Sequence, residues 1–488
     1  MTTELQNTTE SKVNSAPNGS TAQQEFTNRY IDLIEQTFYF PQDGFKVVDN
    51  KLWFYEICLM DLVEKYGSPL RLTYLPKISM QIQRAKELFR NAMAKHQYVG
   101  SYHYAYCTKA NHFSFVFDEA LKNDIHLETS SSFDIDLIGR LIARGKVSQN
   151  KYVISNGFKT EDYQQKIVQY IQKGYSRFIP VLDNKAELDY YEQHLDQPCS
   201  IGIRLAAEEE PNFEFYTSRL GIRYKDVIEF YRTRLRNHPK FRLEMLHFFI
   251  NTGIRDNTYY WTELNKAIKM YCDLRKVNPD LKFLNIGGGL PIKYSLGFDF
   301  DYQYMIDEII RHIKKACKNA RVPEPDIFTE FGNFTVGESG IVIFKVMGEK
   351  LQNDQELWYM LNGSLMTTLP DIWGINQRFI MLPINNWDKE CQRVNIGGIS
   401  CDISDYYTAE MHINQVFLPK NENGPLYLGF FNTGAYQDEL SGYGGIKHCL
   451  IPSPRHVLVS RREDGQLESR VFAEEQKPDT MLSILGFD

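Results

Sequence analysis

The sequence lacks the cysteine spacing of a metal-binding or redox motif. Its eight cysteines are scattered, and no two are separated by only two residues, as zinc-binding and thioredoxin-like motifs require. Isolated cysteines usually serve as small core residues. Unpaired thiols are also typical of a reducing compartment. The cysteine pattern therefore favours a cytoplasmic protein without a metal site.

Long hydrophobic runs and an excess of positive charge are missing too. No apolar run approaches the length of a membrane-spanning helix. The net charge of −7 argues against non-specific binding to nucleic acids, which needs a basic surface. Residues 1–25 have neither the basic start nor the apolar stretch of a secretory signal, and they are rich in Ser, Thr, Asn and Gln. We expect them to form a disordered tail.

Short apolar runs alternate with longer amphipathic segments between about Leu70 and Glu330. The runs are rich in β-branched and aromatic residues and predict strands, whereas the segments between them predict helices. Eight strands are expected, beginning near Tyr102, His126, Tyr152, Arg177, Ser200, Arg242, Lys282 and Asp326. Eight strand–helix units are the number that closes a (β/α)8 barrel of the TIM type. An open, doubly wound parallel sheet is the alternative.

Helical periods become rare after Gly337. Runs such as GIVIFKVM, RFIMLPI and LYLGFFNTG follow one another, separated by Gly, Asn, Asp and Pro, and this pattern predicts an antiparallel β domain. We expect a tail at 1–25, a β-like segment at 26–70 that joins the β domain, a barrel at 71–337 and the β domain proper at 338–488.

The first barrel strand ends in a lysine, Lys109. Functional side chains of such barrels lie where the strands end. Because side chains alternate along a strand, Lys109 shares a face with Cys107 and Ala105, and these smaller residues suit the barrel interior. Partial desolvation there lowers the pKa of a lysine and makes its amine nucleophilic, as a Schiff-base lysine requires. The alternative is a solvated loop lysine.

The seventh and eighth strands also end in residues that suit cofactor chemistry. Gly287, Gly288 and Gly289 let backbone N–H groups approach an anion such as a phosphate, although a tight turn explains them as well. They do not form the GxGxxG pattern of nicotinamide-binding proteins. Glu330 ends the eighth strand, where a carboxylate can keep a pyridinium nitrogen protonated or form a structural ion pair.

The order of these motifs resembles that of the fold type III pyridoxal 5′-phosphate (PLP) decarboxylases. This family acts on ornithine, arginine and diaminopimelate and has an alanine-racemase-like barrel followed by a β domain. Seven segments carry the resemblance, namely YCTKAN, LETSSSFDI, IGIRLA, NIGGGLP, TEFG, SCDISD and NTGAYQ. EEEPNFEFYTSRLGIRY and LGFFNTGAYQ are most similar to a bacterial arginine decarboxylase branch.

The resemblance implies a role for particular residues. Lys109 is expected to hold PLP as a Schiff base and to act in catalysis together with Cys401, which protonates the substrate carbon. The expected cofactor-binding residues are Lys109, Glu128, Arg204, His247, Thr252, Gly287, Gly288, Gly289, Glu330 and Tyr436. The expected substrate-binding residues are Asp402, Asn362 and Asp405. Asp134 lies in the same motif as Glu128.

The chain departs from the family pattern at three positions. Phe249 stands where the family usually has a histidine that stacks on the cofactor, and a phenyl ring can stack but cannot donate a hydrogen bond. Asn333 replaces an arginine near the phosphate, and Asn362 replaces an acidic residue of ornithine decarboxylases. These changes bear on cofactor affinity and on substrate choice.

The resemblance implies decarboxylation of a basic amino acid in polyamine biosynthesis. Diaminopimelate enzymes typically carry glutamate after the cysteine, so the Cys401–Asp402 pair favours a substrate with a cationic tail. A planar guanidinium suits several carboxylates and amides, which favours arginine and its product agmatine. Lysine, ornithine, diaminopimelate and carboxynorspermidine are alternative substrates. A homodimer with shared active sites is expected. A racemase and a non-catalytic homologue are the rival classes.

Overall fold

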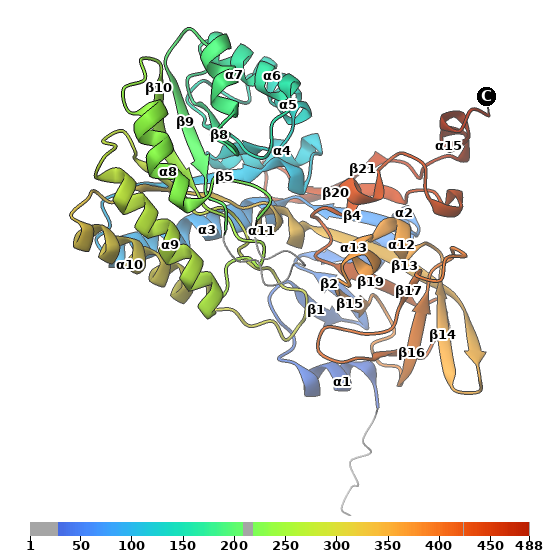
Figure 1. The fold of residues 1–488 in the computed structure, drawn as a ribbon. Helices are drawn as coiled ribbons and strands as arrows, with labels where there is room; N and C mark the ends of the chain where they lie inside the picture. The colour runs from blue at the N-terminus through green and yellow to red at the C-terminus, as the bar shows by residue number, and fades with distance from the viewer. Residues whose placement is uncertain (1–27, 208–217, 423, 488) are drawn as a thin grey trace, which may run out of the picture.

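The computed structural model describes residues 28–207, 218–422 and 424–487, so the tail expected at 1–25 lies outside the described residues. Figure 1 shows two bodies side by side: a barrel surrounded by helices, and a β-rich body that contains both the earliest and the latest described segments. The chain passes from the β-rich body into the barrel and back again.

Eight parallel strands close into the barrel, as the sequence predicts. They pair in chain order, and the circle closes where Glu330 of the last strand pairs with Ala105 of the first. The strands are β5 (Tyr102–Cys107), β6 (His126–Thr129), β7 (Val153–Ser155), β8 (Phe178–Leu182), β9 (Cys199–Arg204), β10 (Phe241–His247), β11 (Phe283–Asn285) and β12 (Asp326–Glu330). This closure rules out the open sheet.

Helices cover the outside of the barrel (Figure 1). They are α3 (Pro76–Lys95), α4 (Ser114–Ala120), α5 (Ser132–Ala143), α6 (Glu161–Gln172), α7 (Glu187–His194), α8 (Tyr224–Phe230), α9 (Thr258–Arg275), α10 (Tyr302–Ala320) and α11 (Asn333–Val336). In α3 the buried residues Ile78, Ile82, Ala85 and Phe89 recur at helical spacing and form one apolar face. That face packs on the barrel, where the Phe89 ring stacks on Tyr102 with centroids 4.0 Å apart.

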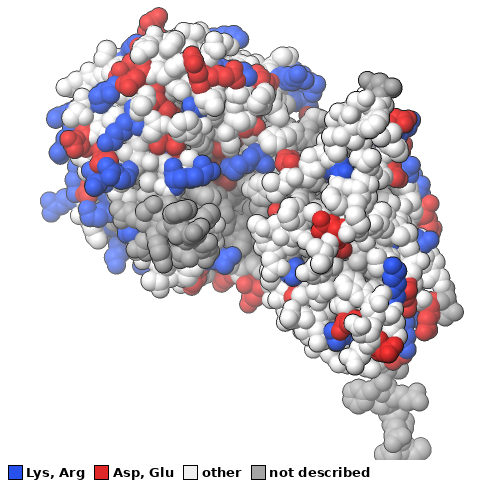
Figure 2. All heavy atoms as spheres, turned by 45° about the vertical axis from the view of Figure 1, so that its right-hand side comes forward, with Lys and Arg blue, Asp and Glu red and all other residues white. Residues whose placement is uncertain are grey.

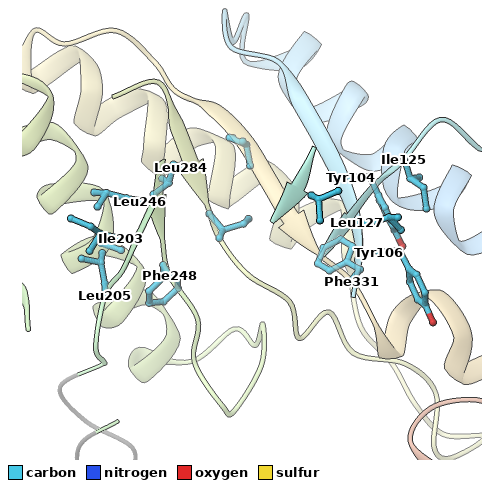
Figure 3. Packing of buried hydrophobic residues seen from close by; sticks show 14 of the residues in the cluster. Tyr104, Tyr106, Ile125, Leu127, Ile203, Leu205, Leu246, Phe248, Leu284 and Phe331 are labelled. Atoms are coloured by element: carbon cyan, nitrogen blue, oxygen red, sulfur yellow. The ribbon is translucent and has the colours of Figure 1, made fainter. Parts of the chain in front are cut away.

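The strands carry two different layers of side chains. Tyr104, Tyr106 and Leu127 point outward into the large core shared with the helices (Figure 3). The side chains between them along each strand point into the barrel, where the His103 ring stacks on Phe328 with centroids 4.4 Å apart. This alternation is the one predicted for the strand that ends in Lys109, and it directs the last inward positions toward the barrel mouth.

A ten-stranded sheet forms the β domain. Its main path runs β17-β16-β14-β13-β4-β20-β21, with β15, β18 and β19 attached to it. The strands are β4 (Leu70–Tyr74), β13 (Gly340–Gln352), β14 (Glu356–Leu361), β15 (Ile380–Pro383), β16 (Cys391–Gly397), β17 (Tyr406–Tyr407), β18 (Val416–Pro419), β19 (Tyr427–Phe431), β20 (Arg455–Arg461) and β21 (Leu467–Ala473). Most pairs are antiparallel, as expected, but β4–β20 and β14–β16 are parallel.

The N-terminal segment packs on this domain. It contains α1 (Tyr30–Thr37), a three-stranded sheet of β1 (Phe45–Val48), β2 (Lys51–Phe54) and β3 (Ile57–Cys58), and α2 (Leu59–Tyr66). The Phe45 ring lies edge-on to Phe431, with centroids 4.9 Å apart, in the second large core. The expected boundary at 70/71 falls at the start of β4, and β4 belongs to the β domain because it pairs with β13 and β20.

Short helices also belong to the β domain. They are α12 (Leu365–Thr368), α13 (Asp371–Gly374) and α14 (Gln437–Ser441), and α15 (Pro478–Ile484) ends the described chain. A buried ion pair between Arg71 of β4 and Asp438 of α14 holds one of these helices against the sheet. Within the described ranges, no helix is both long enough and apolar enough to cross a membrane.

Candidate active site

Lys109 lies at the mouth of the barrel. β5 ends at Cys107, and a single 3-10 turn over Thr108–Ala110 carries the lysine past the strand end. Its Nζ atom lies 3.0 Å from Cys107 Sγ and 3.6 Å from Glu128 Oε2. Half of the side chain, 51%, remains exposed, so the amine is both anchored and accessible.

The charge state of Lys109 differs from the one predicted. Burial alone lowers the pKa of this lysine, but the neighbouring Cys107 and the Glu128 carboxylate raise the pKa well above its ordinary value. The prediction of a lowered pKa is therefore wrong for the chain without a bound cofactor. The strand pattern predicts that the barrel mouth is desolvated. It does not show that Glu128, at the end of the next strand β6, lies close enough to Lys109 to raise its pKa.

Glu330 lies at the centre of a buried hydrogen-bond cluster. Its Oε1 accepts from the Asn156 amide at 2.9 Å and from the Asn285 amide at 2.5 Å. Its Oε2 lies 3.1 Å from His247 Nε2. Burial raises the pKa of a carboxyl, but the charge and hydrogen bond of His247, with the Asn156 amide, lower the pKa of Glu330 to about 2. The side chain is therefore a carboxylate at neutral pH.

Asn156 joins the Glu330 cluster to the lysine. Its Nδ2 donates to Glu128 Oε1 at 3.0 Å as well as to Glu330, and Glu128 is fully buried at the end of β6. Lys109, Glu128, Asn156 and Glu330 thus form one continuous polar network across the barrel mouth. Asn156 was not among the predicted site residues. Its position directly after β7 is the only signal that marks it in the sequence.

A second polar surface at the mouth is made of backbone. Gly287 and Gly289 have positive φ values of 69° and 97°. A Cβ atom at Gly288 would lie 2.4 Å from the Glu330 carbonyl oxygen, so a side chain does not fit there. The Ile254 N–H donates to the Gly289 carbonyl at 2.8 Å and brings the loop after β10 alongside. Thr252 lies in that loop, and its buried hydroxyl has no hydrogen-bond partner among the described residues.

These features fit a phosphate group. The Gly287 N–H already donates to Asn285 Oδ1 at 2.9 Å, so the backbone N–H groups of Gly288 and Gly289 are the ones that suit an anion. An unpaired buried hydroxyl is costly unless a ligand or a water satisfies it. The glycine loop and Thr252 together therefore suit a phosphorylated cofactor, whose ring would lie between this loop and the Lys109–Glu330 network.

Of the departures from the family pattern, Phe249 lies beside the glycine loop, whereas Asn333 contacts Tyr294. The Phe249 ring packs so close that a Cβ at Gly287 would lie 3.2 Å from it. The guanidinium of Arg204, at the end of β9, lies 5.6 Å from the centre of the same ring. Asn333 exchanges a hydrogen bond with the Tyr294 hydroxyl at 3.1 Å. An aromatic ring backed by a cation therefore occupies the position of the usual histidine.

Hydrogen bonds join the turn that carries Tyr436 to the turn that carries Lys109. The Tyr436 N–H donates to the Ala110 carbonyl at 2.9 Å, and the Asn111 amide donates to the Gly434 carbonyl at 3.0 Å. Tyr436 has a φ of 67° at the start of α14, and burial raises the pKa of its hydroxyl. The β domain thus supplies one wall of the barrel mouth.

His112 strengthens the same junction. Its Nε2 lies 2.9 Å from Asp134 Oδ1, and its Nδ1 lies 3.7 Å from Glu439 Oε1. Asp134 also forms a capping box with Ser131 at the start of α5. Hydrogen bonds first to Asp134 and then to Glu439 raise the pKa of His112 to about 9.

We expect His112 to make folding stability depend on pH. Because its folded-state pKa of about 9 exceeds the ordinary 6.5, its contribution is complete below pH 6.5 and is lost as the pH rises through 9. Its side chain is 40% exposed, so solvent screening reduces the contribution to about 1 kcal/mol. Denaturant unfolding of wild type and His112→Gln at low and high pH measures this. The stability difference should shrink at high pH, and a difference independent of pH would contradict the assignment.

Cys401 and Asp402 lie in the β domain, on the loop between β16 and β17. Cys401 is exposed, and Asp402 accepts a hydrogen bond from the Ser404 N–H at 2.8 Å. Among the described residues, no hydrogen bond or ion pair joins either residue to Lys109, Glu128 or Glu330. Cys401 lies next to Cys449 instead, and Asp402 lies next to His448.

The other two expected substrate residues have structural roles. Asn362 accepts from the Lys345 N–H at 2.8 Å and donates to Ser68 Oγ at 3.0 Å, so both ends of its amide are engaged. Asp405 is buried and accepts from the N–H groups of Met366 and Ser400. These contacts engage both side chains within the same chain, and their role toward substrate stays a prediction. Asp405 also shapes the Cys401 loop.

The family comparison agrees with this site. The family described as "Pyridoxal-dependent decarboxylase, pyridoxal binding domain" matches residues 80–337, more than half of the chain. The chain belongs to the pyridoxal-dependent decarboxylases, and its cofactor is pyridoxal 5′-phosphate.

Several individual proteins and solved structures are similar to this chain. "Biosynthetic arginine decarboxylase 2" of Synechocystis is 21% identical, over 88% of this chain and 83% of that protein. "Arginine decarboxylase 2" of Arabidopsis thaliana is 22% identical, over 86% and 74%. Among solved structures, the biosynthetic arginine decarboxylase of Campylobacter jejuni matches 92% of this chain and 89% of its own, with 21% identity and a TM-score of 0.77. The diaminopimelate decarboxylase of Helicobacter pylori in complex with L-lysine matches 88% and 99%, with 19% identity and a TM-score of 0.69. These structures confirm the predicted fold.

Proposed function

We propose that this chain decarboxylates a basic amino acid, L-arginine, to agmatine and CO2 for polyamine biosynthesis. The observation that carries the proposal is the network at the barrel mouth. In this network, hydrogen bonds and an ion pair connect the accessible amine of Lys109 to the ionised carboxylate of Glu330. A glycine loop that suits a phosphate lies next to it. The scattered free cysteines suit a reducing compartment, and we propose a cytoplasmic location.

Each part of the network has a task toward the cofactor. When bound, PLP takes up the electron pair that remains on the substrate carbon after CO2 leaves. Lys109 Nζ would hold the cofactor through its aldehyde carbon. The Glu330 carboxylate keeps a proton on the ring nitrogen, and the Asn156 and Asn285 amides hold that carboxylate in place. Thr252 and the glycine loop bind the phosphate.

Cys401 and Asp402 complete the chemistry in this proposal. The Cys401 thiol donates a proton to the substrate carbon, and the Asp402 carboxylate binds the distal cation. Because the described contacts leave both residues apart from Lys109 of the same chain, we propose that they serve the barrel of a second copy. The active enzyme is then a homodimer with shared sites.

Exposed apolar side chains near the Cys401 loop support a dimer. In the view of Figure 2 the β domain presents a broad surface with few charged side chains. Large exposed hydrophobic residues on the Cys401 loop and on the neighbouring segments are Trp373, Ile375, Ile399, Ile403, Tyr406, Leu440 and Leu450. Several large exposed apolar side chains in one region often mark a protein interface.

Two observations favour arginine as the substrate. Several matched relatives are named arginine decarboxylases, and the acid after the cysteine is aspartate, which suits a cationic tail. We expect purified protein with PLP to release CO2 from arginine at least about tenfold faster than from ornithine, lysine or diaminopimelate, equal to about 1.4 kcal/mol of transition-state binding. Faster CO2 release from another of these amino acids would overturn the assignment of arginine as the substrate. Visible cofactor absorbance without CO2 from any of them would point to racemisation or another reaction.

We expect Asp402→Asn to impair arginine selectively. Loss of one charge-assisted contact should lower kcat/KM for arginine by about tenfold, or about 1.4 kcal/mol, chiefly through a higher KM. Steady-state kinetics against Asp388→Asn, which removes a surface carboxylate, measures the effect. Unchanged kcat/KM in Asp402→Asn would remove this residue from the substrate site.

A further inference from the structure

The two exposed cysteines of the chain lie against each other. All eight cysteines lie in the described ranges; five are buried, Cys391 is partly buried, and only Cys401 and Cys449 are exposed. Their Sγ atoms are 3.3 Å apart, although 48 residues separate them in the sequence. A disulfide requires about 2.05 Å between the sulfurs, so a shift of about 1.3 Å would join them.

The backbone at Cys449 is unusual. Cys449 and Leu450 have consecutive positive φ values of 56° and 51°, a conformation that non-glycine residues rarely adopt and that costs energy. Hydrogen bonds hold this turn, since the Leu450 N–H donates to the Lys447 carbonyl at 3.0 Å. The turn directs Cys449 toward Cys401. The preceding segment contains Gly442, Gly444 and Gly445, which gives the backbone freedom to close the remaining gap.

A base lies beside the pair. His448 Nδ1 is 3.2 Å from Cys449 Sγ, and its Nε2 is 3.9 Å from Asp402 Oδ2. The imidazole can accept the Cys449 proton, and the thiolate is the form of cysteine that reacts with oxidants. The hydrogen bond with Cys449 raises the pKa of the Cys401 thiol, which keeps Cys401 protonated as the second partner.

From these contacts we propose that Cys401 and Cys449 form a site of reversible oxidation by hydroperoxides, in which Cys449 is the reactive thiol and Cys401 closes an intrachain disulfide. The Cys449 thiolate attacks the peroxide, so that an S–O bond forms and the O–O bond breaks; the leaving hydroxide takes from His448 the proton that Cys449 gave up and becomes water. Cys401 then attacks that sulfur, an S–S bond forms, and the oxygen leaves as water. The sulfurs lose two electrons in total, and hydrogen peroxide becomes two water molecules.

The consequence for activity rests on the proposed function. If the Cys401 thiol donates the proton to the substrate carbon, the disulfide removes that proton and blocks turnover until a dithiol reduces it. A peroxide reaches Cys401 by the route of the substrate, because both must approach the same thiol. Oxidation would therefore act directly on the proposed proton donor.

The test uses holoenzyme with PLP, exposed to a small molar excess of hydrogen peroxide, alkylated and digested without reductant. Mass spectrometry should detect the Cys401 peptide joined to the Cys449 peptide, with the loss of two hydrogen atoms. Most of the CO2 release should disappear in parallel, and dithiothreitol should restore both. Cys449→Ser should give no joined peptide, whereas Cys391→Ser, a variant of the partly buried cysteine, should behave as wild type.

Several outcomes would overturn the proposal. These are free Cys401 and Cys449 thiols after oxidation, a link between the buried Cys272 and Cys317 alone, and a link between the Cys401 residues of two subunits. A Cys401–Cys449 link that leaves CO2 release intact would uphold the oxidation site and instead remove Cys401 from the proposed mechanism. The peptide map and the activity assay therefore separate the two failures.

Discussion

Replacement of Lys109 by alanine should reduce CO2 release by about a thousandfold or more, equal to about 4 kcal/mol of transition-state stabilisation. The lysine lies at the barrel mouth, and half of its side chain is exposed. Among the described residues, no second lysine contacts Glu128 or Glu330. The visible absorbance of the lysine-bound cofactor should be absent as well. CO2 assays and absorbance spectra of wild type and Lys109→Ala with added PLP measure both effects.

Two controls make this result specific. Lys269→Ala removes an exposed lysine of α9 that pairs with Asp273 on the barrel surface, and such a pair contributes little to stability. It should retain wild-type activity. In addition, a mixture of Lys109→Ala with Cys401→Ala should recover part of the activity that each variant lacks, because a mixed dimer contains one intact shared site. A Lys109→Ala protein that still decarboxylates at more than about a tenth of the wild-type rate would refute the assignment of the lysine.

Glu330→Gln should lower kcat by about a hundredfold, equal to about 2.7 kcal/mol, while the cofactor stays bound to Lys109. Glutamine has nearly the same shape but carries no charge to hold a proton on the ring nitrogen. Its amide also brings a donor to a position now surrounded by the donors Asn156 and Asn285. Visible absorbance therefore persists as the rate falls, which distinguishes this variant from Lys109→Ala.

A matched variant and a folding check accompany the measurement. Glu87→Gln changes an exposed carboxylate on α3 that pairs with Arg90, and it should leave kcat unchanged. Thermal unfolding of Glu330→Gln shows whether the buried cluster survives. A folded Glu330→Gln enzyme with the wild-type kcat would mean that another group protonates the ring.

The sequence was most informative where signals are local. Each barrel strand is a short apolar run with turn residues on both sides, so the strands and the inward position of Lys109 follow from spacing alone. Glu330 and the glycines could be located because strand ends converge in a closed barrel. The same reasoning would have found Asn156, which directly follows β7.

The sequence was less informative where partners come from distant parts of the chain. The LRLTY run of β4 resembles a barrel strand, and only its pairing with β13 and β20 assigns it to the β domain. The raised pKa of Lys109 depends on Cys107 and on the Glu128 carboxylate, which the next strand brings close. Asn362 and Asp405 resemble substrate ligands in a motif, but their hydrogen bonds go to backbone groups and to Ser68. Tertiary contacts decided all of these cases.

The position of β4 also bears on how the chain acquires its structure during synthesis. β4 lies between β13 and β20, so its two neighbours leave the ribosome only after the whole barrel has been made. Seven of the eight barrel pairings join strands that are consecutive in the chain, and the closing pair of β12 with β5 forms as soon as the barrel segment is complete. Non-local pairing is slow because a long loop must close first. We therefore expect the barrel to fold during synthesis, before the N-terminal segment can pair with the β domain. Until then the edges of β4 are unpaired, and they are the surface to which a chaperone would bind.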